Sequence, residues 1–206
     1  MRFRHIISLT CAALLLSVMT CNAQSDRPRW RLGTEWGYSV AFFNHYHYCY
    51  PDPDIGYRVD DEQYVNIDYL GAYWLICGGY DISERFNASL GVGSMGIYDK
   101  RIVIPVVADV NWLPKGVGCD GPIVTLGGGV AVNSPRHKPI VLARTGAGYR
   151  FALSNWADLD FILRFRASMD HPRVWDADGG RYIDESVVLR NDALYFAVSL
   201  GMVLSF

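Results

Sequence analysis

Two histidines stand two residues apart in a tyrosine-rich stretch of the chain, residues 44–62. If this stretch is extended, His45 and His47 lie on one face, where two imidazoles are a possible zinc or copper pair. A surface histidine pair without a ligand is the simpler interpretation. Tyr, Trp and Arg dominate binding hot spots. This stretch and residues 170–185 therefore predict ligand or partner binding through His45, His47, Tyr48, Tyr50, Trp175 and Arg181.

Catalytic chemistry would need a nucleophile, a base and a group that orients the base. The chain offers histidines in polar connecting segments, among them His137 and His171, and His171 follows Asp170 directly. Neighbouring residues of an extended chain point to opposite faces, so Asp170 is poorly placed to orient the ring of His171. We therefore predict no catalytic residues.

Metal-binding patterns are weak in this sequence. No two of the cysteines have the close spacing of a zinc site. The run from Asp176 to Gly180 resembles the start of a calcium loop, but Val187 stands where the bidentate Glu would be. We predict neither a metal nor a cofactor, and interpret this run as an acidic turn.

The N-terminus has the pattern of a signal peptide. Arg2 and Arg4 precede an apolar run over residues 6–19, and Cys21-Asn22-Ala23 supplies a cleavage site. The run is too short for a membrane-spanning helix. We predict a signal peptide over residues 1–23. A lipid-modified Cys21 is the alternative, although Val18-Met19-Thr20 departs from the usual lipoprotein pattern.

Three cysteines remain after residue 23: Cys49, Cys77 and Cys119. An odd number in an exported protein excludes a fully paired disulfide framework. The spacing leaves two possibilities open, a Cys77–Cys119 bridge that leaves Cys49 over, or three unpaired thiols.

Composition excludes one class of function. The chain has 206 residues with a formal net charge of −2, and it contains no run of Lys or Arg. A phosphate-binding surface needs clustered positive charge. We therefore predict no nucleic-acid partner.

Apolar residues alternate with small or polar ones along most of the remaining chain, which predicts β-strands. Counting back from Phe206, one face of the last segment carries Leu204, Met202, Leu200 and Val198, and the other face is mostly small. Seven further segments show the same pattern: residues 30–43, 64–77, 86–97, 102–113, 123–133, 140–152 and 158–169. In the segment 64–77, we place Tyr73 and Leu75 on the apolar face with Ile67 and Tyr69.

The connections between these segments alternate in kind. Residues 44–63 and 170–185 form long loops, and 98–101 and 134–139 fall on the same side. The other connections, at 81–85, 114–122 and 154–157, are mostly short turns. Eight strands joined in this way predict an all-β, antiparallel up-and-down barrel.

The two faces of the strands demand opposite surroundings. About forty large apolar side chains cannot fit inside eight strands, because such a barrel encloses a narrow interior. We therefore expect the apolar face to meet lipid, with aromatic residues such as Trp36, Trp112 and Tyr149 near the interfaces. Opposite charges then pair in the lumen, where we place Arg31, Glu35, Asp68, Asp109, Arg144, Arg150, Asp158, Asp160, Arg164 and Arg166.

The last eight residues, Ser199 to Phe206, resemble the terminal strand of bacterial outer-membrane barrels. The layout of residues 24–206 is similar to the OmpA-like and OmpX-like eight-stranded barrels. The resemblance implies an outer-membrane β-barrel domain over 24–206, in contact with outer-membrane lipid, and a monomer. It also implies that Phe206 is the signal read by the barrel-assembly machinery.

We predict a non-enzymatic outer-membrane protein of the Gram-negative cell envelope. Its charged lumen is plugged, and its surface loops serve envelope integrity or adhesion. One alternative is a lipid-modifying barrel enzyme, although the His-x-Ser arrangement of the barrel deacylases is absent at His171. The other is a soluble, lipocalin-like binder of small ligands with its charged face outward.

Overall fold

The computed structural model describes residues 28–52, 56–97, 101–132, 138–176 and 179–206. The predicted signal peptide and His137 lie outside this part, as do residues 177 and 178 of the acidic turn. Among the described residues, no helix is long and apolar enough to cross a membrane.

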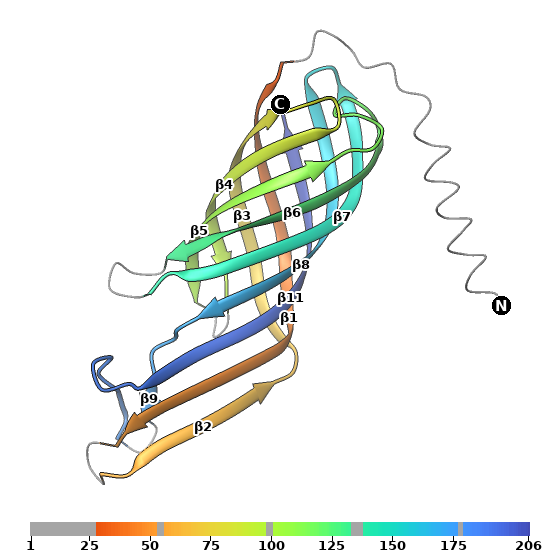
Figure 1. Ribbon diagram of the computed structural model, residues 1–206. Coiled ribbons are helices and arrows are strands. Elements are labelled where there is room, and N and C mark those ends of the chain that lie inside the picture. The colour runs from red at the N-terminus through yellow and green to blue at the C-terminus, as the bar shows by residue number, and fades with distance from the viewer. Residues whose placement is uncertain (1–27, 53–55, 98–100, 133–137, 177–178) are drawn as a thin grey trace, which may run out of the picture.

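Eight long strands follow one another around a closed barrel (Figure 1). Each pairs antiparallel with the next, and the last pairs with the first, which satisfies the backbone of every barrel strand on both sides. The predicted all-β, eight-stranded antiparallel up-and-down barrel is confirmed, and its form is consistent with a transmembrane barrel. The barrel strands are β1 (Trp30–Pro51), β3 (Asp68–Asp81), β4 (Phe86–Gly96), β5 (Ile102–Trp112), β6 (Gly121–Val132), β7 (Ile140–Ser154), β8 (Ala157–Asp170) and β11 (Arg190–Ser205).

The predicted loop over residues 44–63 is wrong, because most of this segment is a β-hairpin. Strand β1 continues to Pro51 and pairs there with β2 (Arg58–Val65) on one side and with β11 on the other. These three strands form a sheet that projects beyond the rim of the barrel (Figure 1). We call it the projecting sheet, defined as residues 44–51, 58–65 and 190–195.

A small apolar core stabilises the projecting sheet. Tyr50, Val174 and Ile183 are buried together, and Tyr48 and Val59 pack against them. Val174 and Ile183 belong to the segment between β8 and β11, which also contains the short strands β9 (Trp175–Asp176) and β10 (Arg181–Tyr182). The alternating tyrosines of residues 46–50 therefore cover one face of a strand, which the loop interpretation overlooked.

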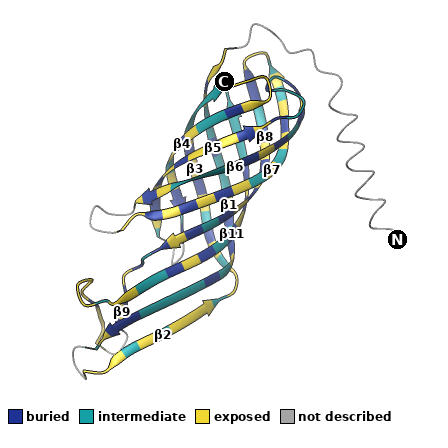
Figure 2. Cartoon of the chain, viewed as in Figure 1, coloured by how far each residue is buried: buried dark blue, intermediate teal, exposed yellow. Residues whose placement is uncertain are grey.

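Outward and inward residues alternate along the barrel strands (Figure 2). In β5, exposed Ile104, Val106 and Val110 alternate with buried Val103, Val107 and Asp109. In β8, exposed Phe161, Leu163 and Phe165 alternate with buried Asp160, Arg164 and Arg166. The apolar face is on the outside of the barrel, as predicted.

One predicted strand is broken into two, and its faces change. Residues 64–77 divide between β2 and β3 at Ile67, whose φ is 57°, and Gly71 has a φ of 85° where the register with β1 shifts. An irregularity of this kind reverses which residues point inward. Tyr73 and Leu75 are therefore buried in the lumen, and the prediction that they face lipid with Tyr69 is wrong.

Tyr73 fits inside the barrel because glycine lies opposite it. A Cβ atom added at Gly37 would lie 2.7 Å from the Tyr73 hydroxyl, and Gly201 faces the same ring.

The cysteines Cys49 and Cys77 have free thiols. A Cys77–Cys119 bridge is therefore excluded.

The positive φ at Gly71 gives a direct test of the bulge. We expect Gly71→Ala to lower the free energy of unfolding by about 1–2 kcal/mol, because a Cβ is unfavourable in the left-handed region. Nothing lies within 4 Å of the added Cβ, so the loss reflects the backbone alone. Gly78→Ala in the same strand is the control, since its Cβ also meets open space and its φ is not positive. Equal urea midpoints for the two variants would contradict the bulge.

Candidate functional site

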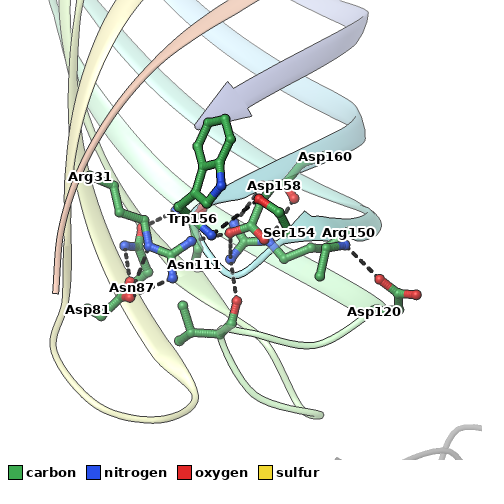
Figure 3. A network of polar contacts seen from close by, with 12 residues as sticks. Arg31, Asp81, Asn87, Asn111, Asp120, Arg150, Ser154, Trp156, Asp158 and Asp160 are labelled. Atoms are coloured by element: carbon green, nitrogen blue, oxygen red, sulfur yellow. Dashed lines mark hydrogen bonds and ion pairs between the residues drawn. The ribbon is translucent and has the colours of Figure 1, made fainter. Parts of the chain in front are cut away.

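The lumen contains two clusters of buried ion pairs. The first lies near the end of the barrel at which β1 begins and β11 ends (Figure 3). Arg31 bonds Asp81 at 2.8 Å and also contacts Asp158. Arg150 bonds both oxygens of Asp160 at 2.7 Å and donates to the Val117 carbonyl oxygen at 2.9 Å. These side chains close this end of the lumen.

Neutral amides extend this first cluster across the barrel. Asn87 donates to Asp81 at 2.7 Å, and Asn111 donates to Asn87 at 3.0 Å. The network therefore joins β1, β3, β4, β5, β7 and β8 through side chains alone (Figure 3). Buried charges are tolerated when they are paired and hydrogen-bonded in this way.

Glu35 is the centre of the second cluster. Its carboxylate lies 3.0 Å from Nε of Arg164 and 3.4 Å from Arg144, and it accepts a hydrogen bond from Tyr73 at 3.0 Å. Arg144 also bonds Asp109 at 2.7 Å. All of these side chains are buried. Glu35 is thus shared by two arginines from β7 and β8 and a hydroxyl from β3.

Three other buried or half-buried charges lie towards the opposite rim. Arg101 pairs with Asp170, and the buried Arg166 contacts Met95 and the Gly96 carbonyl oxygen. Asp68, which we predicted in the lumen network, lies at the first position of β3 and makes no ion pair within the described residues.

Side chains fill the lumen. The cavity beside the first cluster has a volume of about 50 Å³, and the one beside Arg144, Arg164 and Arg166 about 20 Å³. A single water molecule needs about 10–15 Å³ measured in this way. Each of these two cavities therefore has room for only one or a few water molecules.

One face of the projecting sheet carries histidines and acids. His47 Nε2 lies 2.7 Å from Asp60, and its Nδ1 lies 3.2 Å from Glu62. His45 stacks on Tyr64 with the ring centroids 4.6 Å apart. The bond with His47 lowers the pKa of Asp60 below its ordinary value. Two histidines do share one face here, but the described residues contain no group of three or more His, Cys, Asp or Glu arranged to hold a metal ion.

Tyrosines occupy the opposite face of the projecting sheet. Tyr46, Tyr48 and Tyr50 follow one another, with ring centroids 5.1 and 6.2 Å apart. The Tyr48 hydroxyl donates to Asp61 at 2.7 Å. Burial and this bond raise the pKa of Tyr48 to about 12, and the same bond lowers the pKa of Asp61. His45 and His47 therefore lie on a different face from Tyr48 and Tyr50, and these four residues do not form one site.

The remaining candidates lie in the segment that covers the tyrosine face. Trp175 is half exposed and meets Tyr182 edge to face at 4.8 Å, and Arg181 pairs in register with Asp176. His171 Nδ1 lies 2.6 Å from the Asn191 carbonyl oxygen, while the Asp170 carboxylate pairs with Arg101. Asp170 is therefore not positioned to orient the ring of His171.

The sequence did not reveal every member of these clusters. Asp81 was assigned to a turn, although it ends β3 and bonds Arg31. Tyr73 was placed on the wrong face, and Thr125, which accepts a bond from Arg164 at 2.9 Å, was not singled out. Asp81 lies an even number of residues from Tyr73 and Leu75, and a charge in phase with these two residues was the available signal that their face is enclosed.

Comparisons with known proteins provide little beyond the fold. No protein-family profile matches the chain, and no curated protein matches its sequence. The CymD monoaromatic hydrocarbon channel is similar over 87% of this chain, with 12% identity and a TM-score of 0.36. The outer membrane protease OmpT from Escherichia coli is similar over 92% of this chain and 100% of its own, with 7% identity and a TM-score of 0.40. This chain spans 48% of the length of CymD.

The shared position of Glu35 predicts a large effect of its neutralisation. We expect Glu35→Gln to lower the free energy of unfolding by about 3–5 kcal/mol, because two buried arginines lose a counter-charge. Glu62→Gln on the projecting sheet is the control, and we expect its effect to stay within about 0.5 kcal/mol, since Glu62 is half exposed. Urea unfolding in lipid measures both values, and a Glu35→Gln effect no larger than the control would contradict this role.

Proposed function

We propose that this protein is a barrel of the Gram-negative outer membrane that presents the projecting sheet at the cell surface to bind a partner. The observation that carries the proposal is a sharp change in polarity along the outer face of β1 and β11. Outward residues are apolar up to Phe42 and Phe43 on β1 and up to Leu194 on β11, and beyond them lie His45, His47 and Asp192. Such a change is typical of a membrane boundary.

The height of the apolar band supports the membrane placement. From Phe206 back to Phe196 the chain advances about 33 Å at about 3.3 Å per residue, or about 25 Å along the membrane normal for a tilt of about 40°. Aromatic pairs lie at both limits, with ring centroids 5.7 Å apart for Phe165–Phe196 and 5.8 Å for Trp156–Phe206. Outer-membrane barrels have an apolar band of about 25 Å flanked by aromatic girdles.

The polarity of the barrel disfavours the soluble, lipocalin-like alternative. That fold would bury its apolar face and expose its charges. Here Leu126, Leu163 and Leu200 are exposed on the outside, whereas Glu35, Arg144 and Arg164 are buried inside. A filled lumen also keeps the envelope closed, which is compatible with a role in envelope integrity. We propose that neither role involves catalysis.

The outer edge of the projecting sheet is the proposed binding surface. Among the described residues, β2 pairs only with β1, so its other edge is open to a further strand. An open strand edge binds extended peptides through main-chain hydrogen bonds. Asp60, Asp61 and Glu62 follow one another along β2 and favour a positively charged partner. The binding module is thus built from strands held in place by the barrel.

Gel migration tests the membrane placement. We expect the detergent-folded protein to migrate at a different apparent mass before and after boiling, because a closed barrel resists the detergent until it is heated. The chain without residues 1–23 is the sample. Co-migration of the two samples, together with solubility without detergent, would contradict the outer-membrane barrel.

Peptide binding tests the projecting sheet. We expect a peptide of alternating Lys and Val to bind the folded protein in detergent, and one of alternating Glu and Val not to bind. The double variant Asp60→Lys, Glu62→Lys should weaken binding more than about tenfold, because like charges then meet. Asp184→Lys, in an exposed loop, is the matched control and should bind as the wild type does. Equal binding of both peptides would contradict the proposed surface without affecting the barrel.

A further inference from the structure

Arg166 is a buried cation whose charge is not matched by an acid. Its side chain is 6% exposed and points into the lumen from β8. Nη1 contacts the Met95 sulfur, and Nη2 lies 3.5 Å from the Gly96 carbonyl oxygen. Nε has no hydrogen-bond partner in the described part of the chain, which also provides no carboxylate within ion-pair distance of this guanidinium. A buried charge in this position requires compensation.

Neighbouring acids are already engaged by other arginines. Glu35 and Asp109 pair with Arg144 and Arg164, so the second cluster has two charges of each sign without Arg166. The first cluster contains more acids than arginines. Its member Asp160, however, lies six residues from Arg166 along β8, which is about 20 Å at about 3.3 Å per residue. A guanidinium cannot lose its proton in a protein. Arg166 therefore cannot become neutral in the way that a buried lysine can.

The cavity beside Arg166 is lined by hydrogen-bond donors. Its volume is about 20 Å³, and its polar lining consists of Arg144, Arg164, Arg166, Tyr73 and Ser199. The Tyr73 hydroxyl donates to Glu35, and the rest of the lining is apolar, without a carboxylate. A volume of this size holds one water-sized particle. It is too small for a lipid head group or a phosphate.

We propose that this cavity binds one monatomic anion of the halide class, with Arg166 as its counter-charge. Water fits the volume but would leave the positive charge uncompensated. Chloride supplies the charge, accepts hydrogen bonds from guanidinium and hydroxyl groups, and tolerates the apolar part of the lining. The anion then takes the place of the missing carboxylate beside Arg166 and stabilises the folded barrel by mass action.

Stability in different salts tests the site in the intact protein. The folded chain in detergent is unfolded by heat in sodium chloride, sodium bromide or sodium gluconate at one ionic strength. We expect midpoints several degrees higher in the halides, because gluconate is too large for the cavity. Crystals grown in bromide should show an anomalous peak at hydrogen-bond distance from the Arg166 guanidinium. Equal midpoints in all three salts would overturn the proposal.

Two variants with opposite chemistry separate the site from general salt effects. Arg166→Met removes the cation, and Met95→Glu places a carboxylate beside it, so each should abolish the difference between halide and gluconate. Arg190→Gln, an exposed arginine at the start of β11, is the control and should retain the wild-type difference. A halide effect that persists in Arg166→Met would overturn the assignment. If either variant fails to fold, the bromide peak in the wild type still decides.

Discussion

The pairing of β1 with β11 is the contact on which the rest of the structure depends. In lipid, an open sheet edge would leave backbone groups unsatisfied, so the first and last strands must meet. They pair from Gly33 with Ser205 to Cys49 with Arg190, which is longer than the apolar band requires. The additional length of β1 and β11 forms two of the three strands of the projecting sheet. One ladder therefore closes the barrel and also carries its proposed binding surface.

Closure with the apolar face outward creates a second constraint, because the polar face is enclosed. Glycines and serines leave space for arginines, and four of these arginines, Arg31, Arg144, Arg150 and Arg164, pair with acids. Glu35 serves Arg144 and Arg164, and Asp158 serves Arg31 and Arg150. Such sharing ties strands that are distant in sequence to one another. It also fills much of the lumen with paired side chains.

The distribution of charge along the lumen links the barrel to the further proposal. Acids outnumber arginines near the start of β1 and the end of β11, and Arg166 lies towards the other end without a paired acid. Pairing within the protein is limited by distance along a rigid strand, because side chains cannot cross about 20 Å. The proposed anion balances the charge of Arg166, which the distant acids of the first cluster cannot reach. The projecting sheet does not share this problem, since its charges are open to solvent.

The period-two pattern of the sequence by itself determined the strand number, the outward apolar face and the inward position of residues such as Asp109 and Arg164. These follow from local chemistry, because a strand places alternate residues on opposite faces. Only the tertiary structure decided where the alternation is interrupted. The bulge at Gly71 turned Tyr73 and Leu75 inward, and packing against Val174 and Ile183 made the tyrosine-rich segment a hairpin. Partners for Glu35 and the isolation of Arg166 were likewise set by which strands the closed barrel brings together, a relation between residues more than a hundred positions apart that no local pattern encodes.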